Sequence, residues 1–187
     1  MTDKKSIRAR CKKVLSNLDD ESKSNYSLKI TEKVVKLLKE KNIKKVNVYN
    51  SFQNEVQTDK LIEKLSEENF EISLPVICGE ELVGVTLNKQ CEFKVNEYGI
   101  YEPIGEVSDD FQAVVVPMLA FDRSMTRLGR GKGFYDRFLQ NKSIFKIGLA
   151  YSVQEEKVIP CENFDIKMDV IVTEKEVIEI EDNKRKI

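Results

Sequence analysis

Histidine is absent from the 187-residue sequence, and this absence restricts the chemistry that the protein can perform. A chain without histidine cannot build a histidine-based nucleophilic triad, a zinc site of the HExxH type or a histidine general base. Carboxylates, lysines, tyrosines and cysteines remain as candidates for proton transfer. The absence also suits a reaction that depends on positioning and charge neutralisation, as phosphoryl transfer does.

Long apolar runs and paired cysteines are lacking as well. No segment approaches the ~20 apolar residues of a membrane span, and the amino terminus, MTDKKSIRAR, lacks the apolar core of a signal peptide. The four cysteines are dispersed without a CxxC pair, so neither a disulfide framework nor a zinc site is expected. We therefore expect a cytoplasmic protein that has reduced thiols and no membrane partner.

Length and composition favour one domain over residues 1–187. A chain of this length can bury roughly 70% of the surface of its unfolded state. Hydrophobic residues make up 41% of the sequence and charged residues 34%, which is an ordinary composition for a soluble globular protein. The residues become highly charged toward the end, and we expect a frayed tail over about residues 176–187.

Residues 114–139, VVVPMLAFDRSMTRLGRGKGFYDRFL, carry the strongest functional signal. The first residues predict a buried strand, and the apolar spacing of the last ones predicts a short helix. Between them, Gly129, Gly131 and Gly133 alternate with basic residues, and glycine permits positive φ angles and close approach of a ligand. Free N–H groups and the helix dipole converge where such a loop enters a helix, so the stretch predicts a phosphate-binding loop.

The glycine spacing alone does not identify this loop. It is not a Walker P-loop, since Lys132 is followed by Gly133 rather than by Ser or Thr, and it is not GxGxxG. An isolated GxGxG also fits a mobile surface turn. Residues 122–137, however, contain five Lys/Arg and two Asp in a chain with a formal net charge of −1. Such a local concentration of positive charge indicates a polyanionic ligand.

Helical and strand patterns alternate along the rest of the chain. Apolar spacing predicts helices over residues 4–18 and from about 20 to 41, and a third helix that begins after Thr58 as its N-cap. The predicted strands are residues 46–49, 70–75, 82–87, 114–117, 145–150 and 169–173. This alternation predicts an α/β fold with a mostly parallel sheet, and a hairpin around Gly79 adds an antiparallel strand.

Six motifs, in order along the chain, resemble the 5-formyltetrahydrofolate cyclo-ligase family. They are KKSIR at 4–8, NEV at 54–56, YGIYEP at 98–103, PMLAFD at 117–122, RLGRGKGFYDRFL at 127–139 and MDVIVTE at 168–174. The thirteen-residue block is specific, and the resemblance spans nearly the whole chain. It implies a single domain with a three-layer Rossmann-like open sheet.

The resemblance also implies an activity, which is the cyclisation of 5-formyltetrahydrofolate to 5,10-methenyltetrahydrofolate with release of ADP and phosphate. ATP and Mg²⁺ are the implied cofactors, and the substrate is a small folate with or without a polyglutamate tail. In this interpretation ATP phosphorylates the formyl oxygen, and N10 of the folate then attacks the formyl carbon. We expect no nucleic-acid partner and a monomer or weak homodimer.

Site residues follow from the loop chemistry and from the matching motifs. Lys132 and Arg130 are the candidate catalytic residues. The residues expected to bind ATP are Lys4, Lys5, Ser6, Ile7, Arg8, Arg127, Leu128, Gly129, Arg130, Gly131, Lys132, Gly133, Phe134 and Tyr135. The residues expected to bind the folate are Asn50, Glu55, Arg130, Gly131, Lys132, Gly133 and Phe134. By resemblance, the Mg²⁺ ligands are Asp136 and Asp169, which carry the hard oxygen ligands that this ion prefers.

Several alternatives remain open at the level of the residues. The basic residues near the amino terminus also fit a solvated helix face, Glu55 a solvated loop, and Phe134 and Tyr135 core packing. Many family members carry a His-Asp pair near residues 163–165, where this chain has NFD.

Two other functions fit part of the sequence. An RNA-binding module is disfavoured by the net charge of −1 and a sequence pI of about 5.8. A different ATP-dependent kinase or ligase is possible because fold does not determine chemistry.

Overall fold

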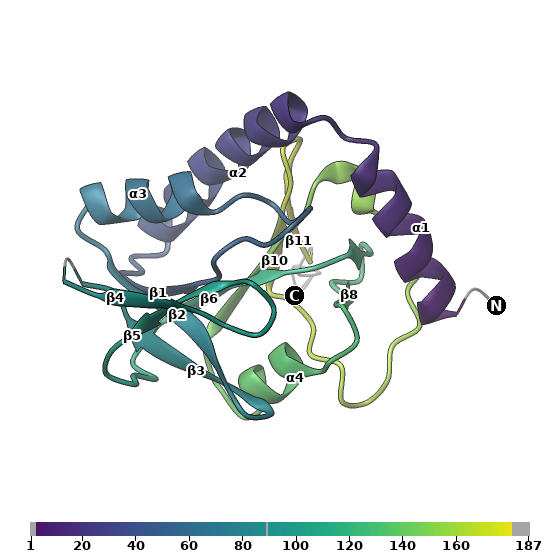
Figure 1. The fold of residues 1–187 in the computed structure, drawn as a ribbon. Coiled ribbons are helices and arrows are strands. Elements are labelled where there is room, and N and C mark those ends of the chain that lie inside the picture. Colours follow the sequence, from purple (N-terminus) through teal and green to yellow (C-terminus); the bar gives the residue numbers. More distant parts are fainter. Residues whose placement is uncertain (1–2, 89, 181–187) are drawn as a thin grey trace, which may run out of the picture.

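A seven-stranded sheet in the order β11-β10-β9-β6-β1-β2-β3 forms the centre of the computed structural model, which describes residues 3–88 and 90–180 (Figure 1). Its strands are β1 (Lys45–Val48), β2 (Glu71–Cys78), β3 (Glu81–Thr86), β6 (Ala113–Pro117), β9 (Phe145–Leu149), β10 (Val170–Val172) and β11 (Val177–Glu179). The five central strands pair in parallel, and β3 and β11 pair antiparallel at the two edges. The predicted α/β fold with a mostly parallel sheet is confirmed.

Helices cover both faces of this sheet because alternate strand residues point to opposite sides. On β6, Val115 packs in the same cluster as residues of α2 (Asp20–Glu40) and α3 (Asp59–Glu67). Val114 and Val116 pack in the cluster that contains residues of α4 (Phe134–Leu139). Figure 1 shows α2 and α3 over one face and α4 over the other, which confirms the predicted three-layer arrangement.

The first two helices, α1 (Lys4–Ser16) and α2, both begin at an aspartate cap. The carboxylate of Asp3 accepts the N–H of Ser6 at 2.7 Å, and that of Asp19 accepts the N–H of Ser22 at 2.7 Å. Each aspartate satisfies a free N–H group and places negative charge at the positive end of a helix dipole. The predicted helices are thus confirmed with slightly shorter ends, and within the described ranges no helix is long and apolar enough to cross a membrane.

Thr58 precedes α3 as predicted, but its side chain does not cap the helix. The hydroxyl instead donates to the carbonyl of Tyr49 at 2.6 Å and accepts the N–H of Ser51 at 3.1 Å. The predicted N-cap position is therefore confirmed, but no side-chain cap hydrogen bond forms, because the hydroxyl is used to hold the loop that follows β1.

Two further hairpin-like pairs lie outside the main sheet. β4 (Glu92–Val95) and β5 (Tyr101–Ile104) form an antiparallel hairpin from residues whose structure the sequence left ambiguous. β7 (Ala120–Phe121) pairs with β8 (Arg127–Leu128) immediately before the glycine-rich loop. A 3-10 helix, η1, spans Ser152–Gln154.

The predicted frayed tail is wrong for the segment that forms β11. Its three residues pair with β10, and Ile178 is buried in the cluster that contains α4 residues. The strand forms because apolar residues at 177 and 178 can extend the sheet despite the charged composition around them. Residues 181–187, the rest of the predicted tail, lie outside the described residues.

Gly84 on β3 allows close contact between the sheet edge and the segment that leads into β6. A Cβ at this position would lie 2.4 Å from the carbonyl oxygen of Ser108 and 3.0 Å from Cε1 of Phe111. We expect Gly84→Ala to lower the free energy of unfolding in urea by about 1–3 kcal/mol, because overpacking forces the backbone to move. Gly79→Asn is the control, since Gly79 has a φ of +63° in open space that asparagine tolerates, and its effect should stay within about 0.5 kcal/mol. Equal effects of the two substitutions would contradict this packing argument.

Candidate active site

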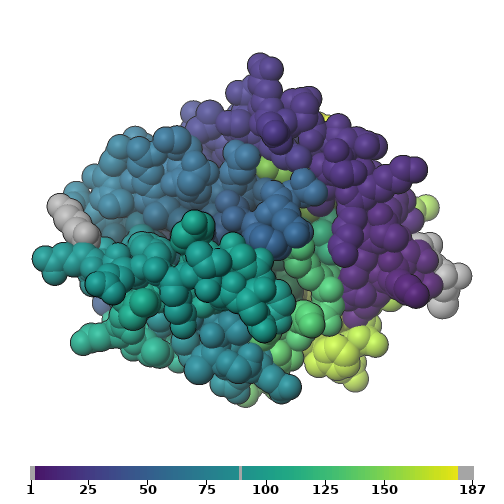
Figure 2. All heavy atoms as spheres, viewed as in Figure 1, coloured from purple at the N-terminus to yellow at the C-terminus, as the bar shows by residue number. Residues whose placement is uncertain are grey.

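A cavity of about 310 Å³ lies at the carboxyl ends of β1, β2 and β6. In Figure 2 the atoms of the glycine-rich segment (green) are recessed between the hairpin (teal) and α1 (purple). Open parallel sheets place ligands at this edge, where the loops after adjacent strands meet. The predicted site residues that line the cavity are Lys4, Arg8, Asn50, Glu55, Arg127, Leu128, Gly129, Arg130, Gly131, Lys132, Gly133, Phe134, Tyr135 and Asp136.

The glycine-rich loop takes a path that requires its glycines. Gly131 and Gly133 have φ angles of +98° and +70°, which side chains with a Cβ rarely adopt. Gly133 is also the N-cap residue of α4. Arg8 packs against the loop, because its Nε donates to the carbonyl of Gly129 at 2.9 Å and a Cβ on Gly131 would lie 3.4 Å from its Cζ. Helix α1 therefore supports the loop from one side.

Arg127 is a buried cation at the wall of the cavity. Its Nη2 donates to Oδ1 of Asp136 at 2.5 Å, and its guanidinium lies 5.9 Å from the ring centroid of Tyr135. Among the described residues, its buried Nε has no hydrogen-bond partner. A buried donor without a partner costs free energy, so this N–H is suited to an anionic ligand.

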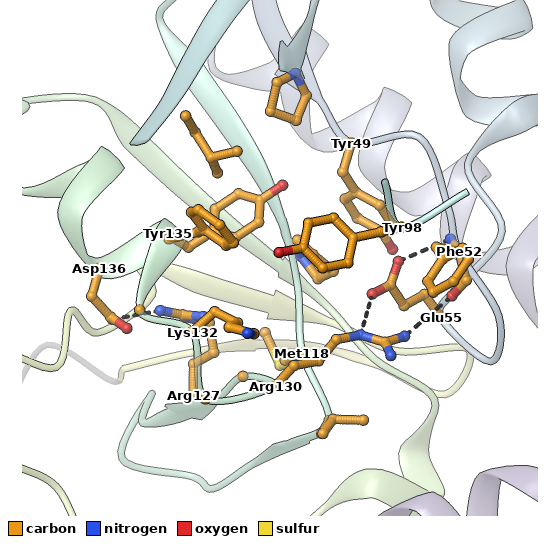
Figure 3. Close-up of a pocket in the computed structure, with 18 of the residues that line it drawn as sticks. Tyr49, Phe52, Glu55, Tyr98, Met118, Arg127, Arg130, Lys132, Tyr135 and Asp136 are labelled. Atoms are coloured by element: carbon orange, nitrogen blue, oxygen red, sulfur yellow. Dashed lines mark hydrogen bonds and ion pairs between the residues drawn. The ribbon is translucent and has the colours of Figure 1, made fainter. Parts of the chain in front are cut away.

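Arg130 connects the glycine-rich loop to the loop that follows β1 (Figure 3). Its Nε lies 3.1 Å from Oε1 of Glu55, its Nη1 donates to Oε1 of Gln53 at 2.8 Å, and its guanidinium lies 5.4 Å from the ring centroid of Phe52. The glycine-rich loop, expected to bind both ATP and the folate, and the loop of Asn50 and Glu55, expected to bind the folate, are thus joined by one side chain.

The carboxylate of Glu55 is held between two donors in a largely buried position. Oε1 contacts Arg130, and Oε2 accepts the N–H of Phe52 at 3.0 Å. Burial raises the pKa of Glu55 above its ordinary value, although Arg130 and the N–H of Phe52 act in the opposite direction. Burial also raises the pKa of Tyr49 and of Tyr135, so both phenols stay protonated at neutral pH.

Lys132 is the cation of the loop with the greatest freedom to meet a ligand. The residue is exposed and lines the cavity, and Figure 3 shows its side chain between those of Arg127 and Arg130. Within residues 3–88 and 90–180 its ammonium group forms no hydrogen bond or ion pair, whereas its carbonyl accepts Nη1 of Arg137 at 3.1 Å. The backbone of Lys132 is therefore fixed while its charge remains available.

The amino-terminal motif reaches the cavity only through Lys4 and Arg8. The ammonium group of Lys4 bridges Glu162 at 2.8 Å and Asp165 at 2.6 Å. The other three residues of this motif, Lys5, Ser6 and Ile7, were also expected to bind ATP, but they do not line the cavity. Ile7 is fully buried in a cluster beneath α1, and the N–H of Ser6 is used by the helix cap.

Comparison with known proteins agrees with these motifs. A model of the 5-formyltetrahydrofolate cyclo-ligase family matches residues 1–174. The chain belongs to this family. It is 32% identical over 178 residues to the 5-formyltetrahydrofolate cyclo-ligase of Haemophilus influenzae, a match that covers 89% of this chain and 95% of that protein.

Solved structures of cyclo-ligase relatives have the same fold. The 5,10-methenyltetrahydrofolate synthetase of Aquifex aeolicus aligns with a TM-score of 0.87 and 33% identity, over 97% of this chain and 95% of that one. The synthetase of Mycoplasma pneumoniae aligns with a TM-score of 0.77 and 25% identity, over 92% of this chain and 99% of that one. The reaction of the cyclo-ligase family is the ATP-dependent conversion of 5-formyltetrahydrofolate to 5,10-methenyltetrahydrofolate, so the chain is a ligase that acts on a folate.

The predicted metal pair of this cyclo-ligase, Asp136 and Asp169, is not brought together. Asp136 lines the cavity, but Asp169 precedes β10, at the amino-terminal edge of the parallel strands. Its carboxylate accepts the N–H of Lys146 at 2.7 Å and lies 2.8 Å from the ammonium group of the same residue. The described residues contain no group of three or more His, Cys, Asp or Glu side chains that could hold a metal. The prediction for Asp169 is therefore wrong in this structure.

Sequence reasoning missed the contribution of the β4–β5 hairpin to the cavity. Asn96, Tyr98, Ile100 and Glu102 all line it, and Figure 3 shows the Tyr98 ring across the cavity from Tyr135. The available signal was the YGIYEP motif, which was used only for the family resemblance. Only the fold shows that this hairpin closes one side of the site.

The raised pKa of Glu55 predicts a pH dependence of stability. A carboxyl with a higher pKa in the folded state holds its proton more tightly there, so it lowers the free energy of unfolding as pH rises from its ordinary value of 4.5 through the raised value. Glu55→Gln removes this dependence. We therefore expect the variant to gain stability relative to the wild type between pH 4 and pH 7. The measurement is the difference between their free energies of unfolding in urea titrations, taken as variant minus wild type. A difference that stays constant over this range would contradict the buried environment of the carboxylate.

Proposed function

We propose that the chain phosphorylates the formyl oxygen of 5-formyltetrahydrofolate with ATP and then closes the ring by attack of N10 on the formyl carbon. One observation carries this proposal. The basic glycine-rich loop and the loop that contains Asn50 and Glu55 line the same cavity. A nucleotide phosphate and a folate formyl group held by these two loops would lie close enough to react.

The chemical difficulty of the reaction is the leaving group. Attack of N10 on the formyl carbon requires the formyl oxygen to depart, and oxide or hydroxide leaves poorly. Transfer of the γ-phosphoryl group to that oxygen releases ADP and forms an iminium phosphate. N10 then bonds to the carbon, its proton is lost, and inorganic phosphate departs with the oxygen. The enzyme has to align the two substrates and neutralise the charge on the transferred group.

The cations of the cavity suit the nucleotide. The unpartnered Nε of Arg127 and the N–H groups of residues 129–134 are the proposed contacts of the triphosphate, with Lys4 and Arg8 alongside. Lys132 is assigned to the transferred phosphoryl group because its ammonium group has no partner among the described residues. Arg130, the second candidate catalytic residue, lies between the loops and is assigned to contacts with both substrates.

The folate is assigned to the opposite loop and to the aromatic walls. A carboxylate such as that of Glu55 can accept paired N–H donors from the amino-pyrimidine edge of a pterin. Asn50 lines the same cavity and donates to the carbonyl of Tyr101 at 3.1 Å, which joins this loop to the hairpin. Phe134 and Tyr135 both line the cavity and supply the aromatic surface against which the folate lies.

The proposed Mg²⁺ fits Asp136. The hydrogen bonds from Arg127 and from the N–H of Ile166 both end on Oδ1, which leaves Oδ2 without a partner among the described residues. Magnesium in phosphoryl-transfer enzymes is usually held by one or two carboxylates together with substrate phosphates. An ion bound at this position would offset the phosphate charge. Acceptance of polyglutamylated folate, a monomeric or weakly dimeric state and a cytoplasmic location remain predictions.

A spectrophotometric assay tests the proposal as a whole. Purified protein incubated with 5-formyltetrahydrofolate should form the methenyl chromophore only when ATP and Mg²⁺ are both present, and ADP and phosphate should appear in equal amounts. Turnover of ATP without the chromophore would indicate a different kinase or ligase. Retention of RNA at physiological salt without any turnover would favour a binding module.

Lys132→Ala tests the assignment of the transferred phosphoryl group. We expect turnover to fall by about two orders of magnitude or more, as when a charge-stabilising group is removed from a transition state, while the unfolding transition stays unchanged because the side chain is exposed. Lys12→Ala is the matched control, since Lys12 is an exposed lysine of α1 that does not line the cavity. Wild-type turnover of the Lys132 variant would remove the assigned role.

A further inference from the structure

Glu102 on β5 is a buried carboxylate that the proposed mechanism does not use. It lines the cavity and is 2% exposed, and Figure 1 shows its strand, β5, well separated from α1. Its Oε1 accepts the N–H of Ile77 at 2.8 Å and the side-chain N–H of Asn96 at 2.8 Å. Within the described chain no hydrogen bond reaches Oε2, and no lysine or arginine forms an ion pair with this carboxylate. Because Glu102 lines the cavity and its Oε2 has no partner among the described residues, this oxygen is suited to accept a donor from a ligand.

The surroundings of Glu102 select the kind of ligand group that fits. Ile77, which donates to Glu102, and its strand partner Leu82 both line the cavity, as does Ile100. Hydrogen bonds are stronger in such apolar surroundings than in water. A phosphate or a free carboxylate would be repelled by Glu102, because no cation is paired with it to offset the charge. A flat, uncharged ring with N–H donors is the ligand group that matches.

We propose that Oε2 of Glu102 accepts N–H donors of the pterin ring and thereby helps to select a reduced pterin as substrate. This inference rests on the proposed function, in which the cavity binds 5-formyltetrahydrofolate. The pterin of that molecule is uncharged and carries several N–H donors, whereas its glutamate tail and the nucleotide are anionic. Glu55 and Glu102 then contact different N–H groups of one ring, and only Glu55 has an arginine partner.

Glu102 also has a structural role, which the test has to separate from ligand contact. Asn96, which donates to Oε1, accepts the N–H groups of Tyr98 at 2.9 Å and Ile100 at 3.0 Å and so organises the turn of the hairpin. Glu102→Gln separates the two roles. The amide oxygen can still accept from Ile77 and Asn96, while an NH₂ group replaces the free oxygen and meets the pterin donors with donors of its own.

The experiment measures folate affinity, nucleotide affinity and stability for Glu102→Gln. Calorimetric titration with 5-formyltetrahydrofolate in the presence of ADP should show an affinity about ten- to a hundredfold weaker than that of the wild type, the range expected for a lost hydrogen bond to a charged group. The KM for ATP in the cyclisation assay and the unfolding midpoint should stay unchanged. Glu92→Gln is the matched control, because it makes the same chemical change at an exposed position of the same hairpin and should leave all three values unaltered.

A pterin fragment identifies the part of the folate that Glu102 contacts. Displacement of 5-formyltetrahydrofolate by 6-methyltetrahydropterin, which lacks the aminobenzoyl-glutamate tail, should weaken in Glu102→Gln by the same factor as folate binding. Wild-type folate affinity in the variant, or a loss confined to the intact folate, would overturn the inference. If Glu102→Gln lowered stability and ATP affinity together with folate affinity, the inference would also be overturned. Glu102 would then act only by stabilising the hairpin.

The outcomes for the inference and for the proposed function can be told apart. Cyclisation by the wild type together with unaltered folate binding in Glu102→Gln refutes only the role of Glu102. Folate binding that depends on Glu102 without any cyclisation refutes only the proposed reaction. A wild-type protein that binds no folate refutes both.

Discussion

The contact between Arg130 and Glu55 depends on the parallel pairing of β1 and β6. These strands are neighbours in the sheet, so the loops that follow them leave from the same edge. Residues 75 positions apart in the sequence thereby come within 3.1 Å. The short β7–β8 ladder turns the chain back before the glycine-rich loop, which brings Arg130 toward the first loop. The whole cavity is built around this meeting of two segments.

The cations of the cavity differ in how firmly the protein holds them. Arg8, Arg127 and Lys4 each bind a backbone carbonyl or a carboxylate, and Arg130 binds the opposite loop. In the described parts of the chain only Lys132, among the cavity's lysines and arginines, has no such partner for its charged group. Fixed charges reduce the reorganisation needed when negative charge develops in a reaction. A flexible lysine beside them can follow a phosphoryl group as it moves between substrates.

Local sequence patterns predicted the parts of this protein that depend on neighbouring residues. The parallel strands, the long helices and the positive φ angles of Gly131 and Gly133 follow from periodicity and from the glycine-rich composition. Contacts between distant residues did not follow, and these include the bond of Lys4 with Asp165 and the position of Glu102 in the cavity. Asp169 matched a motif, but its place before β10 puts it at the opposite edge of the sheet. The edge of the sheet at which a strand begins is decided by the direction of that strand in the sheet, and periodicity carries no information on strand direction.

Three buried or half-buried groups in the cavity are left incompletely paired by the described residues. They are Nε of Arg127, Oδ2 of Asp136 and Oε2 of Glu102. The buried Nε of Arg127 raises the free energy of the ligand-free protein, because a desolvated polar group without a partner is costly. A folded protein can retain such groups when the rest of its core is well packed, as the buried valines of β6 are here. The donor Nε suits an anion, and the two acceptor oxygens suit a cation or an N–H donor. These properties are the ones that the proposed ligands, a magnesium nucleotide and a pterin, would require.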